Sequence, residues 1–256
     1  MEHKLPSPDW YKHIWDLGIK EQSWVESTEQ QLDFIIKALE LTGKERILDL
    51  ACGFGRHSLA FAKRGYSVTG VDITAAYIED AVRNAEREKL SATFLCSDLR
   101  DLQFNSEFDV VLNLADGAIG YLENEEENNK IFKVIARALK PGGKSLMDIC
   151  SQEHALVHFP KKHWEIGQNS ISLPWFDYDS TTKRMLFGGF ELSLGKPLEL
   201  PSCLEAHSST RLYSFAEVTE LFDTLGVDTL SAYGDYDLAE PSDHKHLQLL
   251  IVSQKR

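Results

Sequence analysis

The chain has few of the features that would place it in a membrane or in an oxidising compartment. No apolar run approaches the roughly 20 residues that a membrane-spanning helix requires. The first 16 residues carry charges and a proline where a signal peptide would have an apolar core. These absences argue against a membrane partner, and we expect a cytoplasmic location.

Cysteine is scarce, with four residues in 256. No two of them form a CxxC pair, and they lie far apart, at Cys52, Cys96, Cys150 and Cys203. This spacing is typical neither of a zinc site nor of a disulfide framework. We therefore expect four buried, free thiols and no metal site.

Basic residues are also too few and too scattered for an obvious nucleic-acid surface. The formal net charge is −13, and no run of lysine and arginine is longer than a pair such as Lys161-Lys162. Proteins that bind nucleic acids usually need a basic surface to neutralise phosphates. We expect no nucleic-acid partner.

Helical periodicity and short apolar runs alternate along the first 150 residues. Apolar runs predict strands at 47–50, 68–71, 93–96, 110–112 and 145–149. Helix-type patterns lie before the first run and between most of the others, including one that stops at Pro141-Gly142-Gly143. Strands alternating with helices at this spacing predict an α/β fold with a doubly wound, mostly parallel sheet.

The pattern changes after residue 150. Short β-type segments separated by Gly, Pro and Asp predict an antiparallel β insertion over 151–210. The α/β pattern then returns with a capping box at Ser214 and Glu217 and closing strands at 227–233 and 247–252. We predict a single domain, in which 1–43 form a helical N-terminal cap, 44–150 and 211–256 form the α/β core, and 151–210 cover the active site.

A glycine-containing turn follows the first predicted strand. Leu50 ends the strand, and Gly53 and Gly55 lie in the loop before a helix. Glycines let a backbone bend sharply and approach a ligand closely, and ligands bind beyond the carboxyl ends of such strands. A tight strand-to-helix turn without a ligand explains this pattern equally well.

Two acidic residues at the ends of the next strands strengthen the case for a ligand. Asp72 ends the second strand, where a carboxylate can accept both hydroxyls of a ribose. Asp98 follows the third strand, where it can reach an adenine amino group. Each acid alone is more often a helix cap or a solvated loop residue. Beside the glycine turn, the two outline an adenosine site.

The residues around the turn favour S-adenosylmethionine (SAM) over a dinucleotide. Dinucleotide-binding turns have a third glycine, which would fall at Ser58. Asp49 stands four residues before Gly53, where it would repel a phosphate but suit a cation. SAM carries a sulfonium and an amino group and no phosphate. A nucleotide-dependent oxidoreductase is the weaker alternative.

The ordered motifs resemble those of class I SAM-dependent methyltransferases. They comprise Asp49-x-x-x-Gly53-x-Gly55, Asp72, Asp98, Phe108-Asp109-Val110-Val111 and Leu139-Lys140-Pro141-Gly142-Gly143. Looser similarity over 211–256 resembles a bacterial small-molecule subgroup. The resemblance implies a Rossmann-like, seven-stranded sheet with an antiparallel final strand, and SAM as cofactor.

The resemblance also implies a set of cofactor-binding residues. Asp49 and the Gly53 region would hold the methionine end, Asp72 the ribose and Asp98 the adenine. Leu114 would line the methyl-donor side. The full implied set is Asp49, Ala51, Gly53, Gly55, Arg56, Asp72, Ile73, Asp98, Leu99 and Leu114.

The substrate is less closely defined by the sequence. After the fourth strand the chain reads Asn113-Leu114-Ala115-Asp116, without the Pro-Pro-Tyr/Phe sequence that many DNA and protein-glutamine methylases carry there. We expect a small molecule that is methylated on an amine or a hydroxyl. A catalytically inactive SAM-binding protein is an alternative of another class.

Aromatic residues near the N-terminus are candidates for the acceptor site. Trp10, Tyr11, Trp15 and Trp24 either pack as an ordinary helix or form a lid over donor and acceptor, because aromatic faces attract cations. The candidate substrate residues are Tyr11, Trp15, Arg211 and Tyr213. Arg211 and Tyr213 either line the acceptor cavity or anchor the insertion.

Histidines are the obvious candidates for a general base that a hydroxyl acceptor would need. His57 beside the glycine turn is at least as easily a structural residue. His154, His158 and His163 are more often plain surface residues. No catalytic residue is assigned from the sequence.

Overall fold

The computed structural model describes residues 4–21, 23–166, 170–197, 203 and 205–256. Its largest element is a seven-stranded sheet in the order β13-β14-β5-β4-β1-β2-β3. In chain order its strands are β1 (Arg46–Leu50), β2 (Ser67–Asp72), β3 (Ala92–Cys96), β4 (Phe108–Asn113), β5 (Leu139–Cys150), β13 (Val227–Tyr233) and β14 (Gln248–Lys255).

The pairing of these strands confirms the predicted doubly wound sheet. Strands β1 to β5 pair in parallel, and β14 pairs antiparallel with both β5 and β13. The last strand is therefore the one that runs against the others. This arrangement is the Rossmann-like, seven-stranded sheet with an antiparallel final strand that the resemblance implied, with antiparallel sheets added between β5 and β13.

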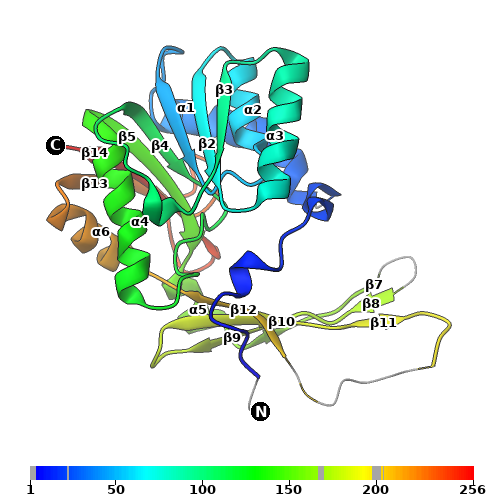
Figure 1. The fold of residues 1–256 in the computed structure, drawn as a ribbon. Coiled ribbons are helices and arrows are strands. Elements are labelled where there is room, and N and C mark those ends of the chain that lie inside the picture. The colour runs from blue at the N-terminus through cyan, green and yellow to red at the C-terminus, as the bar shows by residue number, and fades with distance from the viewer. Residues whose placement is uncertain (1–3, 22, 167–169, 198–202, 204) are drawn as a thin grey trace.

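Helices cover both faces of the sheet (Figure 1). Adjacent residues of β1 belong to different cores: Leu48 packs in the cluster with Phe132 of α4, and Ile47 in the cluster with Phe61 of α2. A strand buried on both faces explains why its sequence is a continuous apolar run. The helices are α1 (Thr28–Ala38), α2 (Arg56–Lys63), α3 (Ala75–Glu88), α4 (Glu125–Ala138), α5 (Gln152–His158) and α6 (Phe215–Thr224).

The predicted capping box starts α6. The Ser214 hydroxyl accepts from the Glu217 backbone N–H, and the Glu217 carboxylate accepts from the Ser214 N–H. Gly226 follows the helix with φ +74°, which favours glycine at a helix end.

Residues between β5 and β13 form two small antiparallel sheets in addition to α5, which the sequence did not predict. One sheet has the order β12-β10-β9-β6 and the other β11-β8-β7. Both lie on the side of the main sheet where β5 ends (Figure 1). Their strands are β6 (Lys161–Lys162), β7 (Glu165–Ile166), β8 (Ser170–Ser172), β9 (Trp175–Asp179), β10 (Arg184–Gly188), β11 (Glu191–Ser193) and β12 (Ala206–Arg211).

The described part of the N-terminal 43 residues contains α1 and three short 3₁₀ helices. These are η1 (Trp10–Lys12), η2 (Leu17–Glu21) and η3 (Ser23–Ser27); a fourth, η4 (Leu99–Asp101), follows β3. Among the described residues, no helix has both the length and the apolar character needed to cross a bilayer.

The expectation of four buried thiols was wrong in part. All four cysteines are free, but Cys96 and Cys203 are exposed. Cys96 ends β3, which is an edge strand and is largely exposed along its length. Cys52 is buried and Cys150 is partly buried.

Candidate active site

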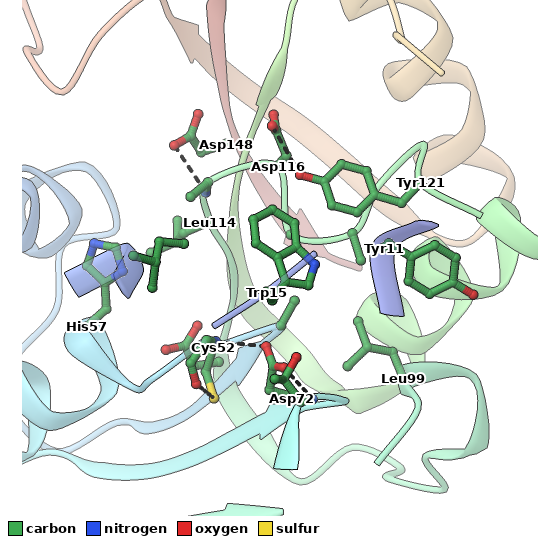
Figure 2. Close-up of a pocket in the computed structure, with 18 of the residues that line it drawn as sticks. Tyr11, Trp15, Cys52, His57, Asp72, Leu99, Leu114, Asp116, Tyr121 and Asp148 are labelled. Carbon is green, nitrogen blue, oxygen red and sulfur yellow. Dashed lines mark hydrogen bonds between the residues drawn. The ribbon is translucent and has the colours of Figure 1, made fainter. Parts of the chain in front are cut away.

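A cavity of about 760 Å³ lies where the parallel strands end. Its walls come from the glycine turn after β1, the ends of β2 and β5, the loops after β3 and β4, and the N-terminal segment. Figure 2 shows Asp72 at one end and Asp116 and Asp148 at the other, with Trp15 between them. Ligands of open α/β sheets bind in this position.

The glycine turn contributes through Gly53 and not through Gly55. Gly53 lines the cavity with φ +57°, and a Cβ added there would meet no atom within 4 Å. Gly55 caps α2 with φ +78°, and its Cβ would lie 2.9 Å from the Phe94 ring. Gly55 is absent from the cavity lining. Gly55 therefore has a packing role, because α2 approaches β3 and α3 closely here, and its predicted role in cofactor binding stays a prediction.

Two backbone N–H groups, one in the glycine turn and one after β2, hold the Asp72 carboxylate in place. Its Oδ2 accepts from the Gly53 N–H at 2.9 Å, and its Oδ1 accepts from the Thr74 N–H at 2.8 Å. The side chain is 8% exposed, and burial raises its pKa. Two fixed donors orient the carboxylate and leave further lone pairs for a ligand. Its neighbour Ile73 also lines the cavity.

Asp98 lines the cavity but is bound by Arg100. Its Oδ1 accepts from the backbone N–H and the Nε of Arg100, both at 2.9 Å, and its Oδ2 accepts from Nη2 at 2.6 Å. These bonds hold the pKa of Asp98 below its usual range. Leu99, the next residue, lines the same part of the cavity.

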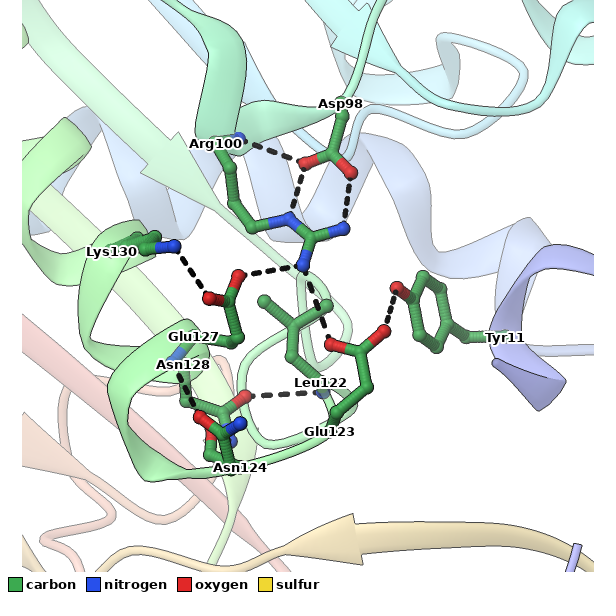
Figure 3. Close-up of polar contacts among 9 residues, drawn as sticks. All are labelled: Tyr11, Asp98, Arg100, Leu122, Glu123, Asn124, Glu127, Asn128 and Lys130. Carbon is green, nitrogen blue, oxygen red and sulfur yellow. Dashed lines mark hydrogen bonds and ion pairs between the residues drawn. The ribbon is translucent and has the colours of Figure 1, made fainter. Parts of the chain in front are cut away.

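Arg100 also reaches two glutamates near the start of α4 (Figure 3). Its Nη1 lies 2.7 Å from Glu127 and 3.3 Å from Glu123. Tyr11 of η1 donates to the other oxygen of Glu123 at 3.2 Å. One arginine therefore connects the loop after β3, α4 and the N-terminal segment.

Asp49 lies at the base of the cavity, 2% exposed. The Ser58 hydroxyl donates to its Oδ2 at 2.6 Å. Burial raises the pKa of Asp49 to about 6, against the opposing effects of the Ser58 bond and the nearby Arg56 charge. Ala51 lines the cavity beside it. Ser58 stands where a dinucleotide-binding turn has its third glycine, and its hydroxyl instead donates a hydrogen bond to Asp49.

Arg56 and His57 both line the cavity and both contact Gln31 of α1. Arg56 Nη1 donates to Gln31 Oε1 at 2.6 Å and to Thr28 Oγ1 at 2.9 Å. His57 Nε2 lies 2.9 Å from the same Gln31 oxygen. Burial lowers the pKa of His57 well below its usual value, so the ring is neutral.

Two acidic residues in the cavity were missed as site residues. Asp148 of β5 is 4% exposed, and its Oδ2 accepts from the Tyr236 hydroxyl at 2.8 Å and the Ala115 N–H at 3.3 Å. Asp116, in the loop after β4, accepts from the Tyr121 hydroxyl at 3.4 Å. Burial raises the pKa of Asp148 to about 7, and the neighbouring Asp116 adds to this rise.

A signal for Asp148 was present in the sequence. It stands in the otherwise apolar run Leu146-Met147-Asp148-Ile149, and a carboxylate in a buried strand is costly unless something compensates for it. No comparable signal pointed to residues 245–248, which precede or begin β14 and also line the cavity.

The candidate substrate residues separate into two groups. Tyr11 and Trp15 line the cavity, as does Leu114. Arg211 and Tyr213 do not: Arg211 pairs with Glu217 at 2.9 Å and stacks over the Tyr213 ring, which is 1% exposed. They anchor the end of β12 to α6, in agreement with the second interpretation from the sequence, in which these residues anchor the insertion. The side chain of Trp24 lies outside the described part of the chain.

The expected covering role of 151–210 has no support in the cavity lining. None of the described residues in that range lines the cavity, and this includes His154, His158 and His163. The wall is closed by the segment before β14 instead, because β14 returns between β5 and β13 and carries that segment over the strand ends. The described residues also contain no cluster of three His, Cys, Asp or Glu side chains that could hold a metal ion.

Comparison with known proteins agrees with this geometry. Residues 47–143 match the family model described as a methyltransferase domain. A putative methyltransferase of Bacillus subtilis, YqeM, is 28% identical over 84% of this chain and 86% of its own. The ubiquinone biosynthesis O-methyltransferase of Coxiella burnetii is 34% identical over 44% of this chain. The matched region covers 47% of that relative.

Solved structures share the fold. A SAM-dependent methyltransferase from Clostridium acetobutylicum matches 96% of this chain and 98% of its own, with a TM-score of 0.73 and 17% identity. SAM-bound CalS10, an amino pentose methyltransferase from Micromonospora echinaspora, matches 95% of this chain and 99% of its own, with a TM-score of 0.66 and 16% identity. Together with the acids at the strand ends, the methyltransferase match over β1 to β5, the relatives and the shared fold support a class I SAM-dependent methyltransferase.

Proposed function

We propose that this enzyme methylates a small molecule that binds beside SAM in the cavity described above. The observation that carries the proposal is the extent of this one cavity. Its volume of about 760 Å³ falls within the range of small-ligand sites. It holds Asp72 at the donor end and Trp15, Tyr121 and Asp148 beyond it, so donor and acceptor have a common enclosure (Figure 2).

The residues of the donor end fit SAM. In this proposal Asp72 accepts the ribose hydroxyls, and the open space at Gly53 admits the methionine end. Asp49, buried near the turn, faces the cationic part of the cofactor. Ile73 and Leu99 supply apolar surfaces for the adenine. When bound, SAM supplies an electrophilic methyl group.

Asp98 has a narrower role in this proposal than the sequence suggested. A carboxylate offers about four acceptor positions, and Arg100 uses three of them. One lone pair on Oδ2 remains for an adenine amino group. Arg100 therefore fixes the direction in which Asp98 can bind.

Catalysis by the chain consists mainly of alignment. Methyl transfer from a sulfonium is an in-line displacement, and orientation of reactants can contribute about 7–11 kcal/mol. Trp15 and Tyr121 lie with ring planes 16° apart and centroids 6.4 Å apart, which leaves aromatic faces on the acceptor side. Such faces favour an acceptor that is aromatic or cationic.

The test is a screen that follows release of S-adenosylhomocysteine. The panel contains small amines, amino sugars and phenols, with bulk tRNA and a protein mixture as macromolecular acceptors. We expect turnover with at least one small acceptor and none with tRNA. Turnover on tRNA or protein, with none on any small acceptor, would contradict the proposal.

Three further predictions from the sequence stay predictions. These are the cytoplasmic location, the lack of a nucleic-acid partner and the organisation of residues 1–256 as a single domain. The domain prediction requires one cooperative unfolding transition. Calorimetric unfolding in two separate steps would contradict it.

A further inference from the structure

We propose that Asp116 and Asp148 make the enzyme specific for an amine, binding the acceptor as its ammonium ion, and that Asp148 takes up the ammonium proton. This inference rests on the proposed function, because it assumes that the acceptor shares the cavity with SAM. It concerns residues that neither the motifs nor the predicted donor site include.

The first observation is that both acids lie close together in the cavity. Asp148 is 4% exposed, and Asp116 is close enough to raise its pKa. The basic residues Lys245 and His246 of the cavity wall pair with Asp243 instead of with either acid. Arg56 lowers the pKa of Asp148 electrostatically, and its Nη1 donates to Gln31 and Thr28. A buried carboxylate without a countercharge is costly, and two together are more so. A cationic ligand would remove this cost.

The second observation concerns how Asp148 is held. Both of its hydrogen bonds, from Tyr236 and Ala115, reach Oδ2. Its Oδ1 receives no hydrogen bond from the described residues. Tyr236 packs from the loop after β13, so the carboxylate is fixed from behind while one oxygen is left for a ligand.

The groups facing Asp148 are mostly neutral or anionic. They are Tyr236 from the loop after β13, Asp116 from the loop after β4, and Cys150 and Tyr121 nearby. Arg56 is the cation with an electrostatic effect on it, and Lys245 and His246 of the segment before β14 line the same cavity. Burial is the largest cause of its raised pKa, which is about 7. A base with a pKa near neutrality is well suited to exchange a proton with an ammonium ion at physiological pH.

The charge arrangement favours an amine over a hydroxyl. An aliphatic amine has a pKa near that of lysine, about 10.4, and enters as a cation without a free lone pair. Two carboxylates bind this cation and then accept its proton. A hydroxyl would instead have to develop negative charge beside a second carboxylate, which repels it.

The proposed step balances as follows. An ammonium N–H proton moves to Asp148 Oδ1, giving a neutral amine and a protonated carboxyl group. The nitrogen lone pair forms the N–C bond with the methyl carbon, and the C–S bond breaks with its electrons going to sulfur. The product is a methylated ammonium ion, and Asp148 releases its proton to solvent.

Binding is tested by calorimetry on the protein saturated with S-adenosylhomocysteine. The probes are benzylamine, cyclohexylamine and glucosamine, each paired with benzyl alcohol, cyclohexanol or glucose. We expect at least one amine to bind at least tenfold more tightly than its hydroxyl partner. Asp116→Asn and Asp148→Asn should each weaken amine binding at least tenfold and change SAM affinity less than twofold. Asp223→Asn, an exposed carboxylate paired with Arg256, is the matched control.

Several outcomes would overturn the inference. These are tighter binding of the hydroxyl probes, no binding of any amine probe, or amine binding unchanged in both Asn variants. Loss of SAM affinity in these variants with unchanged amine binding would assign the acids to the donor instead. Turnover of hydroxyl acceptors alone would refute this inference and leave the proposed function standing. Turnover of macromolecules alone would refute the proposed function.

A second readout covers variants that fold poorly. With an amine that turns over, kcat should rise with pH through about 7 and then level off, because Asp148 must be deprotonated to act. Tyr236→Phe removes a bond that lowers the pKa of Asp148, so the rising limb should move to higher pH. Asp148→Asn should lower kcat about 100-fold or more. If the rising limb of kcat against pH does not move in Tyr236→Phe, Asp148 does not take up the proton and has a structural role only.

Discussion

At the scale of single residues, buried carboxylates set the pH response of the free protein. Burial raises the pKa of Asp49 to about 6 and that of Asp148 to about 7, from the ordinary aspartate value of 3.8. Between pH 4 and 7 the folded protein keeps protons that the unfolded chain gives up. Stability therefore falls as pH rises through this window and, for these two groups, changes no further above it.

This argument predicts a stability gain in one variant. Asp148→Asn should raise the melting temperature at pH 8 by about 3 °C or more, and should have less effect at pH 5. The amide is uncharged at both pH values and still accepts the Tyr236 bond. Thermal unfolding of the SAM-free protein measures the difference. Equal changes at the two pH values would count against the raised pKa.

The two glycines of the turn should respond to alanine in opposite ways. Gly53→Ala adds a methyl group in open space at the cavity wall, so it should weaken SAM binding about tenfold or more with a small stability loss. Gly55→Ala forces a Cβ against Phe94 at φ +78°, so it should mainly lower the unfolding free energy, by about 1–3 kcal/mol. Calorimetry with SAM and denaturant unfolding separate the two effects. The same profile in both variants would contradict the assigned roles.

At the scale of elements, Arg100 stabilises the junction of three segments. Its side chain is 19% exposed and lies among Asp98, Glu123 and Glu127. These carboxylates come from the loop after β3 and from the start of α4. Without the guanidinium they would repel one another, and the link to Tyr11 through Glu123 would weaken.

Arg100→Ala should therefore destabilise the protein in a salt-dependent way. We expect the melting temperature to fall by several degrees at low salt, and the loss to shrink in 1 M NaCl because salt screens the remaining carboxylates. Arg83→Ala removes an exposed pair with Asp80 and should change stability little. The comparison uses thermal unfolding at both salt concentrations. A loss that does not depend on salt would indicate packing as the main role of Arg100.

At the scale of the whole molecule, the N-terminal segment closes the cavity and is tied to distant parts of the chain. Lys4 pairs with Glu205 at 2.8 Å, and the Tyr77 hydroxyl of α3 donates to the Asp16 carbonyl at 2.9 Å. Trp10 packs at 4.8 Å from the Tyr121 ring and is 4% exposed. The segment is thus part of the core at Trp10 and part of the cavity wall at Trp15.

Alanine substitutions should separate these two functions. Trp10→Ala removes a buried aromatic side chain and should cost about 3–5 kcal/mol of unfolding free energy. Trp15→Ala should cost less, because the side chain is only partly buried, but should weaken SAM or acceptor binding by opening the cavity. Denaturant unfolding and calorimetry measure the pair. Equal stability losses with unchanged binding in Trp15→Ala would contradict its place in the wall.

The sequence by itself determined the order of strands and helices and most of the donor end of the site. Apolar runs, the glycine turn and acids at strand ends are local features, and parallel strands bring their carboxyl ends together whatever the loops contain. Asp49, Gly53, Asp72, Asp98 and Leu114 therefore all line the cavity as predicted. Their contacts with bound SAM stay predictions.

Only the tertiary structure decided the end of the cavity that we propose for the acceptor. Asp116 and Asp148 meet because β4 pairs with β5, and residues 245–248 join them because β14 inserts between β5 and β13. The same packing buries Tyr213 against Phe132 and holds Arg211 away from the cavity. Local sequence patterns do not predict these contacts, because the contacts depend on how distant elements pack against one another.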